Sequence, residues 1–385
     1  MAEKHADIVI FGAGIAGLWA FHHFKSLGYN ALLLESTAIG SGQTIASQGI
    51  LHSGLKYAFA GKINSLAANI SAMPDRWRAA LNRQGPVDLA SARLHAPSQY
   101  LLIPSGLMGG LLGLVTRQVL GEQVHTLPKT DWPDSIQGAG FKGALVHMNE
   151  PVLDIPSVLQ ALALPYIDSI RRIDTPEDPL GFLAQNNIHA KILIFTSAGS
   201  NARIACRYGH DAGLETQTRP LLMGMIKPAP FPLYAHCVGP SDKPVITITT
   251  HTAHDGTLLW YCGGAVAERE KESDPTLVFK AIRQACATYF PALDLKNLSW
   301  ASLPIDRIEG RSRTDGWLPD TPTIHQHENH LYCWPTKLTF APLLTERLLE
   351  RITISPSCTT TDWSFLPELP FVLPPWETVQ WHSTH

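Results

Sequence analysis

The stretch Asp7-Ile-Val-Ile-Phe-Gly-Ala-Gly-Ile-Ala-Gly17 decides the fold of this chain. The run after Asp7 is short, apolar and rich in β-branched side chains, which is typical of a buried strand. An apolar helical stretch follows over residues 18–27, and a second strand is predicted over residues 31–34, ending at Glu35. Strand, glycine-rich turn, helix, second strand and terminal acid occur in the order of a dinucleotide-binding βαβ unit.

Each glycine of this turn has its own physical role. Gly12 permits the tight turn, Gly14 lets the backbone approach a pyrophosphate, and Gly17 lets the helix pack on the strand. The helix N-terminus offers N–H groups and about half a positive charge to that pyrophosphate. Glu35 is placed to accept hydrogen bonds from a ribose diol, and it disfavours the 2′-phosphate of NADP. The residues predicted to form this cradle are Gly12, Ala13, Gly14, Ile15, Ala16, Gly17 and Glu35.

The alternative is that the motif is a glycine-rich turn of some other α/β protein. A second match in this chain shows that the glycine spacing alone is a weak signal. Gly138-Ala-Gly-Phe-Lys-Gly143 has the same spacing. It follows Asp131-Trp-Pro133 instead of a strand, and no helix opens after it. We therefore expect a loop there and place nucleotide binding at the first match alone.

Length and composition limit the function classes. With 385 residues, 45% of them hydrophobic, the chain can form one large domain or two that share a core. The formal net charge is −3 and no run of five Lys or Arg occurs, which disfavours nucleic acid and allows at most peripheral membrane contact. The six cysteines are far apart with no CxxC, typical of reduced thiols. We expect no signal peptide and no spanning segment, hence a cytoplasmic protein.

The segment after Glu35 is small and polar, from Ser36 to Gly49. Such a segment can run its backbone along a cofactor and supply hydroxyl and N–H donors, although it would also suit a solvated loop. Its position directly after the ribose acid favours the first interpretation. The residues predicted to contact a cofactor here are Ser36, Gln43, Thr44, Ser47, Gln48 and Gly49.

The next stretch, Ser47-Gln-Gly-Ile-Leu-His-Ser-Gly-Leu-Lys-Tyr57, resembles a known family. It is similar to the segment H-[S/G]-G-x-[R/K]-Y of FAD-dependent glycerol-3-phosphate dehydrogenases and L-2-hydroxyglutarate oxidases. Those enzymes belong to the D-amino-acid-oxidase-like (DAO) superfamily. The resemblance implies a bound FAD, with this segment beside the isoalloxazine ring.

Three later segments resemble the same superfamily in the same order. Residues 191–201 form an apolar strand ending in Ala198-Gly199, similar to the family's second cofactor-edge turn. Residues 310–322 resemble its "G-x-R-P-x-x-x-D-G-x-P" turn, and Ser312 in place of proline leaves open whether Arg311 or Arg313 is the family arginine. Lys337-Leu338-Thr339 resembles "G-G-K-L-T-T", with Pro335-Thr336 replacing the glycine pair.

These observations predict an α/β (α+β) fold: a Rossmann-like FAD-binding domain with an inserted antiparallel-sheet substrate domain. We expect the first domain over residues 1–85, 145–215 and 305–385, and the second over 86–144 and 216–304. Residues 144–148 are expected to form a strand returning to the cofactor domain. The Pro- and Trp-rich residues 353–385 are expected to pack as an arm over the body, or to bind a partner or membrane surface.

A flavin dehydrogenase must fix the substrate's anionic group, remove a proton and stabilise charge at flavin N1 and O2. Lys56, Tyr57 and Arg311 or Arg313 are candidates for the first task, or else surface residues and structural ion pairs. His52 is the candidate base, or else a residue that hydrogen-bonds the backbone. Lys337 and the helix after it are candidates for the third task.

We therefore predict an FAD-dependent dehydrogenase or oxidase that oxidises the CH–OH of a small anionic substrate by hydride transfer to flavin N5. An amine or amino-acid oxidase is the alternative, and a flavoprotein module in RNA or protein modification is a second alternative. Oxygen, a quinone or a carrier protein all remain open as the electron acceptor. We expect no metal site: His325, His327 and His330 fall in a polar turn without a partner cluster.

Overall fold

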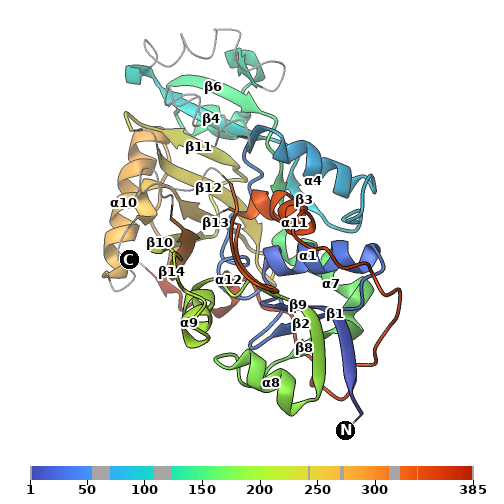
Figure 1. Cartoon of the computed structure of the whole chain (residues 1–385). Helices are drawn as coiled ribbons and strands as arrows, with labels where there is room; N and C mark the ends of the chain where they lie inside the picture. Colours follow the sequence, from blue (N-terminus) through green and yellow to red (C-terminus); the bar gives the residue numbers. More distant parts are fainter. Residues whose placement is uncertain are drawn as a thin grey trace.

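A mainly parallel sheet of six strands contains the predicted βαβ unit (Figure 1). The computed structural model describes residues 2–53, 70–107, 124–241, 243–268, 273–311, 321–335 and 337–383. The order of the sheet is β15 (Thr323–His327), β16 (His330–Trp334), β9 (Ile188–Phe195), β1 (Lys4–Phe11), β2 (Ala31–Glu35) and β8 (Ile170–Arg172). Only β15 runs antiparallel to its neighbour. The central strand is β1, buried as its apolar run predicts.

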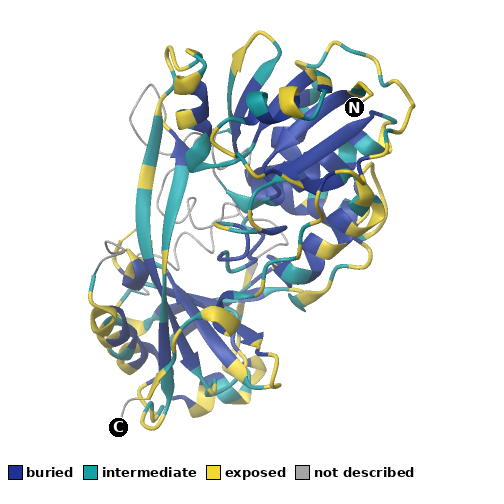
Figure 2. Cartoon of the chain, turned by 90° about the horizontal axis from the view of Figure 1, so that it is seen from below, coloured by how far each residue is buried: buried dark blue, intermediate teal, exposed yellow. Residues whose placement is uncertain are grey.

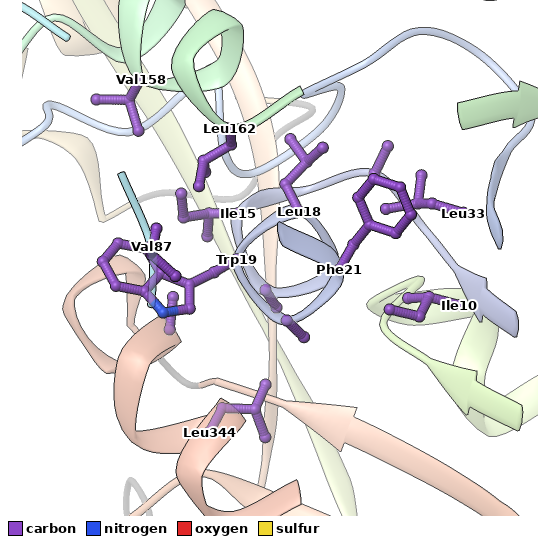
Figure 3. Close-up of a cluster of buried hydrophobic side chains, with 14 of the residues drawn as sticks. Ile10, Ile15, Leu18, Trp19, Phe21, Leu33, Val87, Val158, Leu162 and Leu344 are labelled. Carbon is purple, nitrogen blue, oxygen red and sulfur yellow. The ribbon is translucent and has the colours of Figure 1, made fainter. Parts of the chain in front are cut away.

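Helices cover both faces of this sheet because side chains of β1 alternate between them. Ile8 and Ile10 face a core made with α1 (Ile15–Ser26), α7 (Ile155–Ala163), α11 (Ala341–Leu349) and α4 (Met73–Leu81). Figure 3 shows side chains of α1 packed among residues of α7 and α11 and of the sheet. Val9 and Phe11 face a second core with α8 (Pro179–Gln185) and α9 (Gly199–Arg207). The helix after the glycine turn is therefore buried along most of its length, and only its C-terminal end reaches the surface.

A second sheet of nine strands lies beside the first, and buried residues gather in both (Figure 2). Its order is β17 (His382–Ser383), β14 (Ser299–Gly310), β10 (Thr216–Lys227), β13 (Leu258–Gly263), β12 (Pro244–Thr252), β11 (Ala235–Val238), β4 (Gln99–Pro104), β6 (Gly143–Met148) and β5 (Val124–Leu127). All pairs are antiparallel except β11 with β4. Helix α10 (Pro275–Tyr289) packs on this sheet.

One strand assignment and one domain boundary from the sequence are wrong in detail. Strand β6 pairs with β4 and β5 in the nine-stranded sheet, so it does not return to the cofactor domain. Strand β14 pairs with β10 along its whole length, so a boundary at residue 305 would cut a strand. Both errors arise because pairing partners distant in sequence decide which sheet a strand joins. The two-domain division itself stays a prediction.

The short elements and the C-terminal arm connect these layers. They are α6 (Asp134–Gly138), α12 (Pro375–Thr378) and the paired β3 (Leu94–Ala96) and β7 (Val152–Leu153). As expected for a packed arm, Trp363 and Leu366 join the core of the six-stranded sheet and Trp376 joins that of the other. Among the described residues, no helix has the length and apolarity needed to cross a bilayer.

The helix–strand contact at Gly17 yields a test of the fold. A Cβ at Gly17 would lie 1.9 Å from the Gly12 carbonyl oxygen, so the backbone must shift to accept it. We expect Gly17→Ala to lower the free energy of unfolding by about 1–3 kcal/mol, measured by urea titration. Gly138→Ala is the matched control, because a Cβ there meets nothing within 4 Å and the residue ends a helix. Equal stability of the two variants would contradict the close packing.

Candidate active site

A cavity of about 1470 Å³ lies between the two sheets. One wall is formed at the carboxyl ends of β1 and β2 and just after β9, where β1 has neighbours reached by different crossovers. Parallel sheets bind their ligands at such a switch point. The other wall comes from β10, β14 and nearby strands of the second sheet. Typical small-molecule pockets have about 300–1,000 Å³, so this cavity has room for more than one small molecule.

The glycine turn keeps one end of the cavity open to a ligand. Gly12 has φ +104°, and a Cβ there would lie 2.9 Å from the Thr196 carbonyl. The first turn of α1 contains no acidic residue of its own, and the positive end of the helix faces the cavity. The Ile15 N–H donates to Thr44 Oγ1 at 2.9 Å. Because a hydroxyl that accepts can still donate, the Thr44 hydrogen is available for an anionic ligand.

Glu35 fixes the same turn from the end of β2. Its carboxylate accepts the backbone N–H of Ala13 at 2.9 Å and those of Ser36 and Thr37 at 2.8 and 3.0 Å. The side chain therefore stands at the cavity edge in one orientation, as a ribose-binding acid must. The Ala13 N–H is used by this bond, which makes the contribution of Ala13 indirect.

Most of the predicted cofactor residues converge on the cavity from distant parts of the chain. Gln48 donates from Nε2 to the carbonyls of Thr247 at 3.1 Å and Tyr261 at 2.9 Å, which ties the polar segment to the second sheet. The predicted residues that line the cavity are Gly12, Gly14, Ile15, Ala16, Glu35, Ser36, Gln43, Thr44, Ser47, Gln48, Gly49, Ala198, Lys337, Leu338 and Thr339. Those that do not are Ala13, Gly17 and Gly199.

The predicted catalytic residues are only partly brought together. His52 and Lys337 line the cavity. Lys56, Tyr57 and Arg313 lie outside the described residues. Arg311 is exposed and does not line the cavity, so the structure gives no support to its predicted role in fixing the anionic group.

His52 has a buried acidic neighbour that the sequence analysis missed. Its Nδ1 lies 3.7 Å from Oε2 of Glu150, a residue only 2% exposed. Glu150 also accepts from Ser53 N at 2.7 Å, from Ser53 Oγ at 2.6 Å and from Gln99 Nε2. Burial acts to raise the pKa of Glu150. Interactions with His52 and Ser53 and the charges of His52 and His236 outweigh this effect and lower the pKa to about 2. The carboxylate is therefore ionised.

A second histidine completes this group. His236 in β11 stacks on His52 with ring centroids 5.4 Å apart, and its Nδ1 lies 2.7 Å from Thr247 Oγ1. One atom from each of His52, Glu150 and His236 lies within 4.8 Å of the others, which is the composition of a metal site. Both Glu150 oxygens already accept hydrogen bonds from the protein, so Ser53 and Gln99 are partners of the carboxylate as an alternative to a metal ion. The absence of a metal stays a prediction.

The second sheet adds a wall of charged side chains that the sequence analysis also missed. Arg219 and Arg307 are cross-strand neighbours on β10 and β14, and both line the cavity with Lys243. Buried Glu309 pairs with both arginines, and Glu268 pairs with Arg219 and Lys243. Asp306 of β14 also lines the cavity, so this wall carries three cations and three carboxylates and is charged without a net excess of either sign. The usable signal was the alternation of side chains on two long strands, but only their register identifies the inward residues.

The fold and the site together define a dinucleotide-binding protein whose cofactor cleft faces a second sheet lined with charged side chains. Residues 7–334 match the DAO family model, described as FAD dependent oxidoreductase. The chain belongs to this family of FAD-dependent oxidoreductases.

Similar proteins match this chain over nearly its whole length. The probable FAD-dependent oxidoreductase PA4991 of Pseudomonas aeruginosa is 35% identical over 96% of this chain and 97% of its own. Its crystal structure superposes with a TM-score of 0.81 at 30% identity, covering 98% of this chain and 99% of that one. Two more distant structures share the fold. Glycine oxidase from Geobacillus kaustophilus has a TM-score of 0.62 at 15% identity, covering 96% of this chain and 100% of that one. L-α-Glycerophosphate oxidase from Mycoplasma pneumoniae has a TM-score of 0.58 at 13% identity, covering 94% of this chain and 100% of that one.

The residues present fit FAD, which is the cofactor of this family. Gly12 and Gly14 line one end of the cavity, a Cβ on either would meet Thr196 or Thr44, and Glu35 stands at the same edge. A close-packed glycine turn with an acid at the end of the second strand is the pattern that suits a diphosphate and a ribose. The predicted family, fold class, cofactor and oxidoreductase activity are thus confirmed. The individual residue roles stay predictions.

Thr44 offers a direct test of the cradle. Thr44→Val removes both the acceptor for the Ile15 N–H and the hydroxyl donor at the helix terminus. A hydrogen bond to a charged group contributes about 1.5–3 kcal/mol, so we expect the Kd for FAD to rise about 10–150-fold. Fluorescence titration of the apoprotein measures this, and Thr44→Ser should stay near the wild type. An unchanged Kd for Thr44→Val would remove Thr44 from the cofactor site.

Proposed function

We propose that this enzyme oxidises the CH–OH group of a small anionic substrate, such as a 2-hydroxy acid or a polyol phosphate. The observation that supports this proposal is the pairing of His52, on the cavity wall, with the buried and ionised Glu150. When bound, FAD would supply the group that accepts the hydride from the substrate.

An alcohol substrate needs a base, whereas an unprotonated amine does not. As the C–H bond breaks, the hydroxyl proton must be taken up by a nearby group. Because His52 Nδ1 faces Glu150, Nε2 is the nitrogen that would take this proton. Glu150 then orients the imidazole and stabilises the imidazolium that forms, as carboxylates do in histidine–carboxylate pairs. The pair therefore suits the oxidation of an alcohol.

Basic side chains of the cavity offer binding partners for an anionic substrate. Arg219, Lys243 and Arg307 line one wall, and Lys337 lines the cavity at the other wall. Guanidinium and ammonium groups are the side chains that bind carboxylates and phosphates through charge-assisted hydrogen bonds. A 2-hydroxy acid or a polyol phosphate offers both an anionic group for these side chains and a hydroxyl group.

The substrate class can be read from anaerobic flavin reduction. Both glycine oxidase and glycerophosphate oxidase share this fold, so the fold does not choose between amines and alcohols. We expect L-lactate, L-2-hydroxyglutarate or glycerol 3-phosphate to bleach the flavin in stopped flow, and glycine or L-proline to leave it oxidised. Bleaching by the amino acids alone would reject the proposal in favour of an amine oxidase.

Removing the base should slow the chemical step without releasing the cofactor. We expect His52→Asn to lower the flavin reduction rate about 10²–10⁴-fold with the best substrate of that panel, because general bases contribute this much. The flavin content should match the wild type. The control His254→Asn changes an exposed histidine that does not line the cavity. Its flavin reduction rate should equal that of the wild type. A reduction rate for His52→Asn within a few-fold of the wild type would exclude His52 as the base.

A further inference from the structure

His236 presents a charge problem whose solution goes beyond the proposed base. Glu150 is an ionised carboxylate with almost no exposure to solvent. A buried charge is costly unless an opposite charge compensates it. Ser53 and Gln99 donate hydrogen bonds but have no net charge. Among the residues that the structure describes, His52 and His236 are the titratable groups placed to compensate Glu150.

His52 cannot compensate Glu150 and also act as the base. A protonated His52 would balance the carboxylate, but it could not take a substrate proton until it lost its own. His236 resolves this conflict by its position: its ring stacks on His52, and Thr247 Oγ1 fixes its Nδ1. A proton held on His236 balances Glu150 and, by repulsion across the stacked rings, disfavours a second proton on His52.

We propose that His52, Glu150 and His236 form one unit in which His236 holds the resting proton, so that His52 is neutral and ready to act as the base. Here His236 and Glu150 are positioning residues that act through His52. The unit is neutral at rest, with one carboxylate and one imidazolium. This inference rests on the proposed oxidation of an alcohol.

The reaction balances within this unit and the cofactor. The substrate O–H bond breaks as an N–H bond forms at His52, and the electron pair of the breaking C–H bond leaves with hydrogen to the oxidised FAD. The carbinol becomes a carbonyl, and the unit gains one positive charge. Glu150 stabilises that charge because its Oε2 lies 3.7 Å from His52 Nδ1. The unit later returns its extra proton to solvent.

The two positioning residues should move the pH profile in opposite directions. Glu150→Gln keeps an amide among Ser53 and Gln99 but removes the charge that favours protonated His52. The pH at half-maximal flavin reduction should fall, with a lower plateau. His236→Asn keeps a partner for Thr247 but leaves His52 as the compensating cation, so that pH should rise. Each shift should be about 1–3 pH units. A residue that only maintains the fold would lower the plateau without moving the profile.

The matched control is His147→Asn, which removes a histidine of β6 that pairs with Ser98 outside the unit. It should leave the profile in place. Shifts of Glu150→Gln and His236→Asn in the same direction, or no shift in either, would overturn the proposal. Zinc or iron bound stoichiometrically to the purified holoenzyme and lost in Glu150→Gln would overturn it too, because the three residues would then bind a metal ion.

A second measurement separates this inference from the proposed function. ¹⁵N NMR of histidine-labelled holoenzyme at pH 7, assigned with His52→Asn and His236→Asn, reports both imidazoles without any substrate. We expect a protonated His236 and a neutral His52. If the NMR result is as expected but no hydroxyl compound reduces the flavin, the alcohol chemistry is rejected and the proton arrangement is kept. Neutral His236 at pH 7 would reject the arrangement even if lactate bleached the flavin.

Discussion

The close approach of backbone to backbone at the first turn is the constraint on which the rest of the structure depends. Gly17 packs its Cα against the Gly12 carbonyl, and Gly12 packs against the Thr196 carbonyl after β9. Glu35 then ties the same turn to β2 through the Ala13 N–H. These contacts bring the ends of three parallel strands to one edge of the sheet. The cavity and its two walls follow from that alignment.

The parts of this arrangement that are local in sequence could be predicted. The strand, turn, helix, second strand and Glu35 lie within 35 residues, and each leaves a mark in residue type. The second glycine motif has no helix after it, as expected: its first glycine ends α6, a short loop follows, and β6 begins at its last glycine. The choice of FAD over NAD depended on the resemblance of residues 47–57 to a flavoprotein family, because the glycine turn is common to proteins that bind either cofactor.

The parts that depend on long-range pairing could not be predicted. The sheet that β6 joins is decided by β4, which lies on the far side of residues 108–123. Arg219 and Arg307 look like ordinary surface residues until the register of β10 with β14 turns them toward the cavity. Glu150 and His236 carry no spacing motif, because their partners come from separate loops and strands. A single polar residue within the apolar run of β11 was the one signal for His236.

The charge of Glu150 needs an explanation that its structural contacts do not give. Its hydrogen bonds join Ser53 in the cofactor segment to Gln99 in the second sheet, and so connect the two sheets at the cavity wall. A neutral amide or a packed apolar side chain could make such a connection at lower electrostatic cost, since buried ion pairs seldom add net stability. What only a carboxylate provides here is a fixed negative charge beside two imidazoles that face the cavity. The unfavourable burial is therefore best understood as the cost of controlling where protons reside next to the substrate.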